Sequence, residues 1–144
     1  MEPELSALRE YIRSLGFPRG KAPADPPQFP FITISREAGA GGSSLAGKIV
    51  QEAARRGGPL FSGWSVCDRE LCERVAADPE LTVVLDSLLR EDFRGEFADY
   101  VAQFIADSSP QFVVMGRMFR AIRAAAAMGK TVIVGRGGGC VTRS

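Results

Sequence analysis

Histidine is absent from the chain, and cysteine is rare. Without histidine, no Ser-His-Asp or Cys-His catalytic triad can form. The three cysteines, Cys67, Cys72 and Cys140, have no C-x-x-C spacing, so the composition gives no basis for a zinc site. We interpret the thiols as small apolar packing residues in a reducing compartment, which makes the cytoplasm the expected location.

An excess of charge of one sign is also missing, as is any long apolar run. The formal net charge is +1, so there is no electrostatic reason to expect nucleic acid or an anionic membrane as a partner. No stretch of about 18 apolar residues is present, so no transmembrane helix is predicted. The N-terminus, M-E-P-E-L, lacks a basic segment followed by an apolar run and does not read as a secretory signal.

What is present suffices for one domain with a hydrophobic core, preceded by a helix and a linker. Apolar residues recur at helical spacing through residues 1–15, which predicts an amphipathic helix. This helix would dock on the domain or on a partner, and docking in cis is favoured. Residues 16–30 contain five prolines and are predicted to be a linker. The domain itself is predicted to cover residues 31–144.

Strands and helices alternate along the predicted domain. Strands are expected at residues 31–34, 60–66 and 131–134, where β-branched and aromatic residues cluster. Helices are expected at residues 44–56, from Asp68 onward, in two runs within residues 80–107, and from Pro110 to Met128. This order predicts an α/β fold of three layers, in which helices flank a parallel sheet.

A glycine-rich segment, S-R-E-A-G-A-G-G-S-S at residues 35–44, joins the first predicted strand to a helix. Converging backbone N–H groups bind phosphate where side chains are absent and φ can be positive, which selects glycine. The N-terminus of the following helix adds unpaired N–H groups and the positive end of its dipole. We therefore predict a phosphate-binding loop, with either serine hydroxyl as a magnesium ligand. Its residues are Gly39, Ala40, Gly41, Gly42, Ser43 and Ser44.

Two registers of the G-x-x-x-x-G-K-[ST] pattern can be drawn on this segment. The literal one runs from Gly42 to Lys48 and lies inside the predicted helix, away from the strand. The register counted from the strand end is physically better; it puts Ser43 at the hydroxyl position and Gly42 at the lysine position. Arg36 then either replaces the missing lysine as a phosphate cation or braces the loop through an ion pair. A Rossmann loop would put Ser44 at its third glycine position, which does not fit.

Three segments of the chain are F-I-T-I-S-R-E-A-G-A-G-G-S-S-L-A, D-R-E-L and G-K-T-V-I-V-G-R-G. Together they resemble the cytidylate kinase-like family of P-loop nucleoside monophosphate kinases, over roughly residues 31–140. The resemblance implies transfer of a phosphoryl group from ATP to CMP or a related monophosphate, with Mg²⁺. It places the nucleotide-phosphate loop on residues 39–44.

The same resemblance assigns residues to the acceptor nucleotide. Asp68 matches the start of the segment that faces the acceptor, and Arg136 matches an arginine that approaches the acceptor phosphate. Arg74 is a weaker match to an acceptor-binding arginine. Each has a structural alternative: a helix cap for Asp68, a surface ion pair for Arg136 and an exposed helix arginine for Arg74. Arg36 and Arg136 are the predicted catalytic cations.

Two departures from the family pattern weaken the catalytic prediction. Gly42 stands where authentic cytidylate kinases have lysine, and the sequence ends at Ser144, before the further strands and the arginine-bearing lid that the family implies. We expect the N-terminal portion of a kinase-like protein, with a sheet incomplete on its C-terminal side and weak catalysis on its own. The alternatives are a non-catalytic nucleotide- or phosphate-binding module, or a fragment whose sheet edge another chain covers. An incomplete sheet and the N-terminal helix also favour a homo-oligomer.

Overall fold

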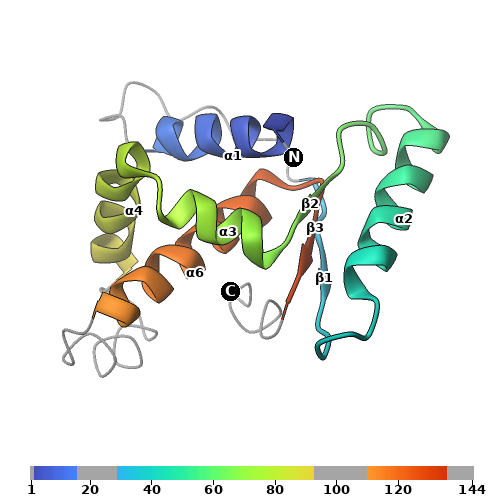
Figure 1. The fold of residues 1–144 in the computed structure, drawn as a ribbon. Helices are drawn as coiled ribbons and strands as arrows, with labels where there is room; N and C mark the ends of the chain where they lie inside the picture. The colour runs from blue at the N-terminus through green and yellow to red at the C-terminus, as the bar shows by residue number, and fades with distance from the viewer. Residues whose placement is uncertain (1, 16–28, 93–109, 136–144) are drawn as a thin grey trace.

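A computed structural model describes residues 2–15, 29–92 and 110–135 (Figure 1). Their elements, in chain order, are α1 (Glu2–Leu15), β1 (Ile32–Ile34), α2 (Gly42–Arg56), β2 (Ser65–Cys67), α3 (Arg69–Ala76), α4 (Pro79–Asp92), α6 (Pro110–Met128) and β3 (Thr131–Val134). No helix within these ranges has the length and hydropathy needed to cross a membrane.

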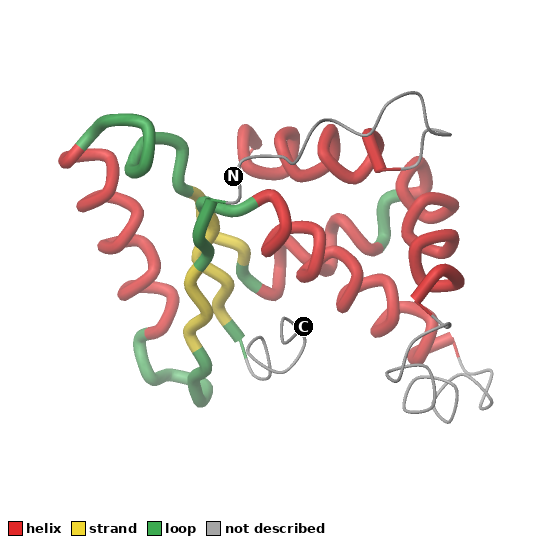
Figure 2. The backbone as a smooth tube through the Cα atoms, turned by 180° about the vertical axis from the view of Figure 1, so that it is seen from behind, coloured by secondary structure: helices red, strands yellow, loops and turns green. Residues whose placement is uncertain are grey.

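The strands form a parallel sheet in the order β1-β3-β2. The chain moves from β1 out to β2 and then returns to β3, so crossovers of one hand must place their helices on opposite faces. In Figure 1, α2 covers one face and α1, α3, α4 and α6 lie on the other, and Figure 2 shows the same division from behind. The predicted α/β fold with a helix-flanked parallel sheet is confirmed.

This strand order differs from the two common doubly wound arrangements. In the Rossmann order the second strand lies between the first and third, and in the flavodoxin-like order the first strand is central. Here the third strand is central, with Thr33 paired to Ile133 on one side and Val66 paired to Val132 on the other. The topology therefore agrees with the rejection of a Rossmann loop.

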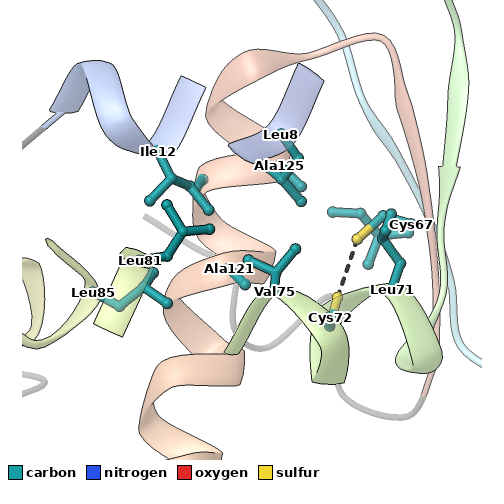
Figure 3. Packing of buried hydrophobic residues seen from close by; sticks show 12 residues of the cluster. Leu8, Ile12, Cys67, Leu71, Cys72, Val75, Leu81, Leu85, Ala121 and Ala125 are labelled. Carbon is teal, nitrogen blue, oxygen red and sulfur yellow. Dashed lines mark hydrogen bonds between the residues drawn. The ribbon is translucent and has the colours of Figure 1, made fainter. Parts of the chain in front are cut away.

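The core lies on both faces of β3, whose four residues are all buried. Side chains alternate across a strand, so Ile133 enters the larger cluster, while Val132 and Val134 face α2. Figure 3 shows the larger cluster. Its buried members are Leu8, Ile12, Cys67, Leu71, Cys72, Val75, Leu81, Leu85, Ala121, Ala124, Ala125 and Ile133.

Helix α1 docks in cis, as expected from its apolar stripe. Ile12 is fully buried and Leu8 almost so, and α1 packs against α4 and α6. Two ion pairs join α1 to the start of α4: Arg9 with Asp78 and Arg13 with Glu80.

The prediction of a second strand at residues 60–66 was wrong for residues 60–64, because β2 begins at Ser65. Residues 58–63 form turns, in which the N–H groups of Phe61 and Ser62 donate to the Gly58 carbonyl. Gly63 has φ +82°, and the Trp64 indole N–H donates to the Leu60 carbonyl at 2.9 Å. These local bonds stop the apolar run from pairing with β3 until residue 65.

Candidate functional site

The three strands end at one edge of the sheet, the lower edge in Figure 1. Ile34 is level with Val134, and Cys67 with Ile133. The glycine loop follows β1, and Asp68 follows β2. Gly135 follows β3 and keeps it beside β1, because its N–H donates to the Ile34 carbonyl at 3.0 Å. Open α/β sheets bind ligands at such carboxyl ends, where the strand order reverses.

Two glycines shape the loop between β1 and α2. The Ala40 N–H donates to the Glu37 carbonyl at 3.2 Å, and Gly39 has φ +80°, which together describe a type II turn. Gly41 is the N-cap of α2, with φ +77° and ψ 15° in the left-handed region. An added Cβ would meet nothing within 4 Å at either position. Backbone conformation, and not lack of space, therefore requires glycine here, and the outer side of the loop is open.

The first turn of α2 presents backbone donors without acceptors. The first helical hydrogen bond runs from the Leu45 N–H to the Gly41 carbonyl at 3.0 Å. The N–H groups of Gly42, Ser43 and Ser44 precede it and have no acceptor among the described residues. No described side chain caps this end, and the first turn carries no acidic residue. Within the described part of the chain, the positive end of the helix dipole is therefore uncompensated.

Arg36 lies on this helix end, against Gly42. A Cβ added to Gly42 would come within 2.5 Å of Arg36 Cδ and 2.9 Å of its Cγ. Arg36 Nη1 approaches the Glu37 carbonyl at 3.4 Å, while the buried Nε has no hydrogen-bond partner in the described part of the chain. No described carboxylate forms the bracing ion pair. The guanidinium and the helix dipole thus place positive charge at one point, an arrangement that an anion would stabilise.

The literal register of the P-loop pattern is ruled out, because residues 42–48 lie within α2 and form no loop. Lys48 is exposed on that helix. In the register counted from the strand, Arg36 fills the space beside Gly42, where the pattern has lysine.

Asp68 is the N-cap of α3, as the structural alternative proposed. Its Oδ1 accepts a hydrogen bond from the Leu71 N–H at 2.9 Å. Parallel strands lie about 4.8 Å apart, and β3 separates β1 from β2, so Asp68 and the end of β1 are roughly 10 Å apart. Asp68 and the glycine loop therefore lie on the same edge but on opposite sides of β3.

The two remaining arginine predictions have different outcomes. Arg74 is an exposed residue in the last turn of α3, which leads away from the sheet edge (Figure 1). The structure does not bring it to the loop. Arg136 lies outside the described residues, and the last described residue before it is Gly135, at the carboxyl end of β3.

The described part of the chain offers no cluster of metal ligands at this edge. Within residues 2–15, 29–92 and 110–135, no group of three or more cysteine and acidic side chains is placed to hold a metal ion. Ser43 and Ser44 are both exposed at the start of α2, on the outer side of the loop. Their hydroxyl groups are the ones that would hold a magnesium ion at the loop, an ion that prefers oxygen ligands.

The contact between Cys67 and Cys72 was not predicted from the sequence. The sulfur atoms of Cys67 and Cys72 lie 3.1 Å apart, and both residues are buried. Cys67 immediately precedes the N-cap Asp68, and Cys72 is the fourth residue of α3. These are the N′ and N4 positions, whose side chains pack together in a hydrophobic staple. The predicted cap at Asp68 was therefore a sufficient signal for this contact.

No family model, curated protein or solved structure matches the chain. The fold is therefore known from the structure alone, and the resemblance to cytidylate kinases rests only on the three sequence segments quoted above.

Proposed function

We propose that the chain binds the phosphates of ATP at residues 39–44 and acts in phosphoryl transfer to CMP or a related nucleoside monophosphate. One observation carries the proposal. Among the described residues, no acceptor meets the N–H groups of residues 42–44 or the buried Nε of Arg36, which lie at the same helix end. A phosphate group accepts from all of them and neutralises the guanidinium and the dipole.

The donor side would use backbone groups and one cation. Residues 42–44 would donate to the β- or γ-phosphate oxygens, and Arg36 would supply the charge that lysine supplies in the P-loop pattern. Ser43 or Ser44 would hold Mg²⁺ through a hydroxyl, and the ion would offset the negative charge that develops in phosphoryl transfer.

The acceptor side would lie on the far side of β3. Asp68 uses Oδ1 to cap α3, which leaves Oδ2 available for a hydroxyl or amino group of the acceptor. Arg136 would approach the acceptor phosphate. The ends of β1 and β2 are about 10 Å apart, so the donor and acceptor sites would face each other across β3.

A second candidate is a nucleotide-binding module without catalysis. The contact between Arg36 and Gly42 favours it, because it leaves the loop with one cation and no lysine. Transition-state charge in phosphoryl transfer needs several cations, so binding would survive where turnover does not.

Isothermal titration with MgATP and with CMP, combined with chromatography of the nucleotides after incubation, tests these functions. Binding with formation of ADP and CDP supports the kinase, and binding without products supports the module. Absence of ATP binding contradicts both.

The loop assignment has its own variant and matched control. Gly41→Val puts a β-branched side chain at φ +77° and should abolish ATP binding. Gly47→Ala, in the interior of α2 with open space around its Cβ, should leave binding unchanged. Equal ATP affinity of the Gly41→Val and Gly47→Ala variants would remove the loop from the site.

A further inference from the structure

Cys67 and Cys72 face each other across the junction of β2 and α3 (Figure 3). Cys67 is the last residue of β2, and Cys72 lies in the first turns of α3. Asp68 between them holds the turn by capping the helix. The staple arrangement of a capped helix therefore brings two side chains together, and here both are thiols.

The pair is enclosed by the larger core cluster. Both cysteines are 2% exposed, and both are free thiols. The hydrogen bond between the two thiols and burial in apolar surroundings raise the pKa of Cys67. Cys67 is therefore a protonated thiol at rest, consistent with the expected packing role.

We propose that Cys67 and Cys72 are a redox-responsive pair that closes a disulfide between the end of β2 and the first turns of α3. Their sulfur atoms are 3.1 Å apart, about 1 Å more than an S–S bond. Rotation of the two side chains can supply this approach, because the cap at Asp68 already fixes the backbone turn between them. The proposal does not depend on nucleotide binding.

The oxidant would be a small-molecule disulfide such as oxidised glutathione, which would reach the two buried thiols when α3 frays from its N-cap. One protein thiol loses its proton, and its thiolate attacks a glutathione sulfur, which forms a mixed disulfide and releases one glutathione thiolate. The second protein thiol then loses its proton and attacks the protein sulfur of that mixed disulfide. This forms the bond between Cys67 and Cys72 and releases the second glutathione. Two protein thiols are oxidised, one glutathione disulfide is reduced, and two protons pass to two glutathione thiolates.

A closed bond would join β2 to α3 around Asp68. Helix α3 would then no longer be free to tilt or to fray from its cap at the carboxyl edge of the sheet. Oxidation would hold this side of the edge in one geometry, while the glycine loop on the other side of β3 stays as it is.

The experiment uses the full chain with Cys140→Ser, so that only the two paired thiols remain. The protein is equilibrated with mixtures of reduced and oxidised glutathione, quenched with acid and digested without reduction. We expect a species about 2 Da lighter than the dithiol, and a link between the tryptic peptides of residues 57–69 and 70–74. The same titration in concentrated guanidinium chloride gives the reference for the unfolded chain.

The equilibrium constant for forming the disulfide should be at least about tenfold larger in the native protein than in the unfolded chain, because folding keeps the sulfur atoms in contact. By linkage, the oxidised protein should then melt at a higher temperature than the reduced protein. Cys67→Ser and Cys72→Ser, each with Cys140→Ser, should give no linked peptide. The proposal would be overturned by glutathione adducts that form without the linked peptides. It would also be overturned if the midpoint of the titration, as the ratio of squared reduced to oxidised glutathione, is no higher for the native protein than for the unfolded chain. A dominant disulfide link to Cys140 in the natural chain would overturn it as well.

Discussion

Arg36 lies with its aliphatic stem on the backbone of Gly42, at the first turn of α2. A cation beside a helix N-terminus is unfavourable unless an anion is present, because both carry positive charge. The stem can remain there only because residue 42 has no Cβ. The absence of a lysine at position 42 is thus what allows the Arg36 stem to pack there.

Removal of the Arg36 charge should weaken ATP binding. Arg36→Met keeps much of the stem but loses the charged donors, and we expect ATP affinity to fall about 10- to 100-fold, the range of a charge-assisted hydrogen bond. Arg36→Lys keeps a cation and should lose less. Gly42→Ala should behave like Arg36→Met, because the added methyl group displaces the arginine. Isothermal titration checks all three, and undiminished affinity in Arg36→Met would assign the arginine to loop packing alone.

Asp68 allows its two roles to be separated by substitution. Asp68→Ala removes the cap of α3 and should lower the free energy of unfolding by about 1 kcal/mol. Asp68→Asn caps equally well but has no charge, so its stability should be unchanged. Urea unfolding measures the first effect and titration with CMP the second. If Asp68→Asn is as stable as the natural protein and binds CMP as well, the residue is a cap only.

At the scale of elements, α1 belongs to the packed core of the domain. Ile12 and Leu8 enter the larger cluster, and the pair of Arg9 with Asp78 ties α1 to the first turn of α4. Asp78 also caps α4, because its Oδ1 accepts from the Glu80 N–H at 2.9 Å. The buried carboxylate of Asp78 therefore both caps α4 and forms an ion pair with α1.

Truncation of the α1 contact should destabilise the whole domain. Ile12→Ala removes a fully buried side chain and should lower the free energy of unfolding by about 2–5 kcal/mol. Ser6→Ala, on the exposed side of the same helix, should change it by less than about 0.5 kcal/mol. Chemical unfolding of both variants provides the check. Equal stability would mean that α1 does not contribute to the core in solution.

The elements also show which parts of the fold were predictable. β3 and the cap at Asp68 followed from local signals, since a short β-branched run and a capping residue act within a few neighbours. The start of β2 was missed because pairing with β3 and turn bonds around Gly58 decide it. The fit of Arg36 against Gly42 depends on how a loop folds back on a helix, and no spacing rule contains that information.

At the scale of the molecule, the sheet is covered unequally on its two faces. The α2 face rests on a small cluster whose buried members are Ala46, Val132 and Val134. Of the described helices, α1, α3, α4 and α6 lie on the other face, together with the larger cluster. The layer that bears the glycine loop is therefore the less firmly packed one.

This inequality should be visible in amide hydrogen exchange. We expect α2 to exchange faster than α6 and β3, because fewer buried apolar contacts oppose its local opening. Saturating MgATP should then slow exchange at the start of α2, near residues 42–44, with little change in α6. Mass spectrometry of peptic peptides gives both results. Protection of α2 equal to that of α6 would contradict the packing argument.

The contact between Arg36 and Gly42 also has an evolutionary consequence. Positions 36 and 42 share one space, so we expect their residues to differ together in any related chain. A lysine at position 42 is compatible only with a shorter or displaced residue at position 36. A change from one pairing to the other would move the proposed phosphate cation from the strand side of the loop to the helix side, while the backbone of the loop stays the same.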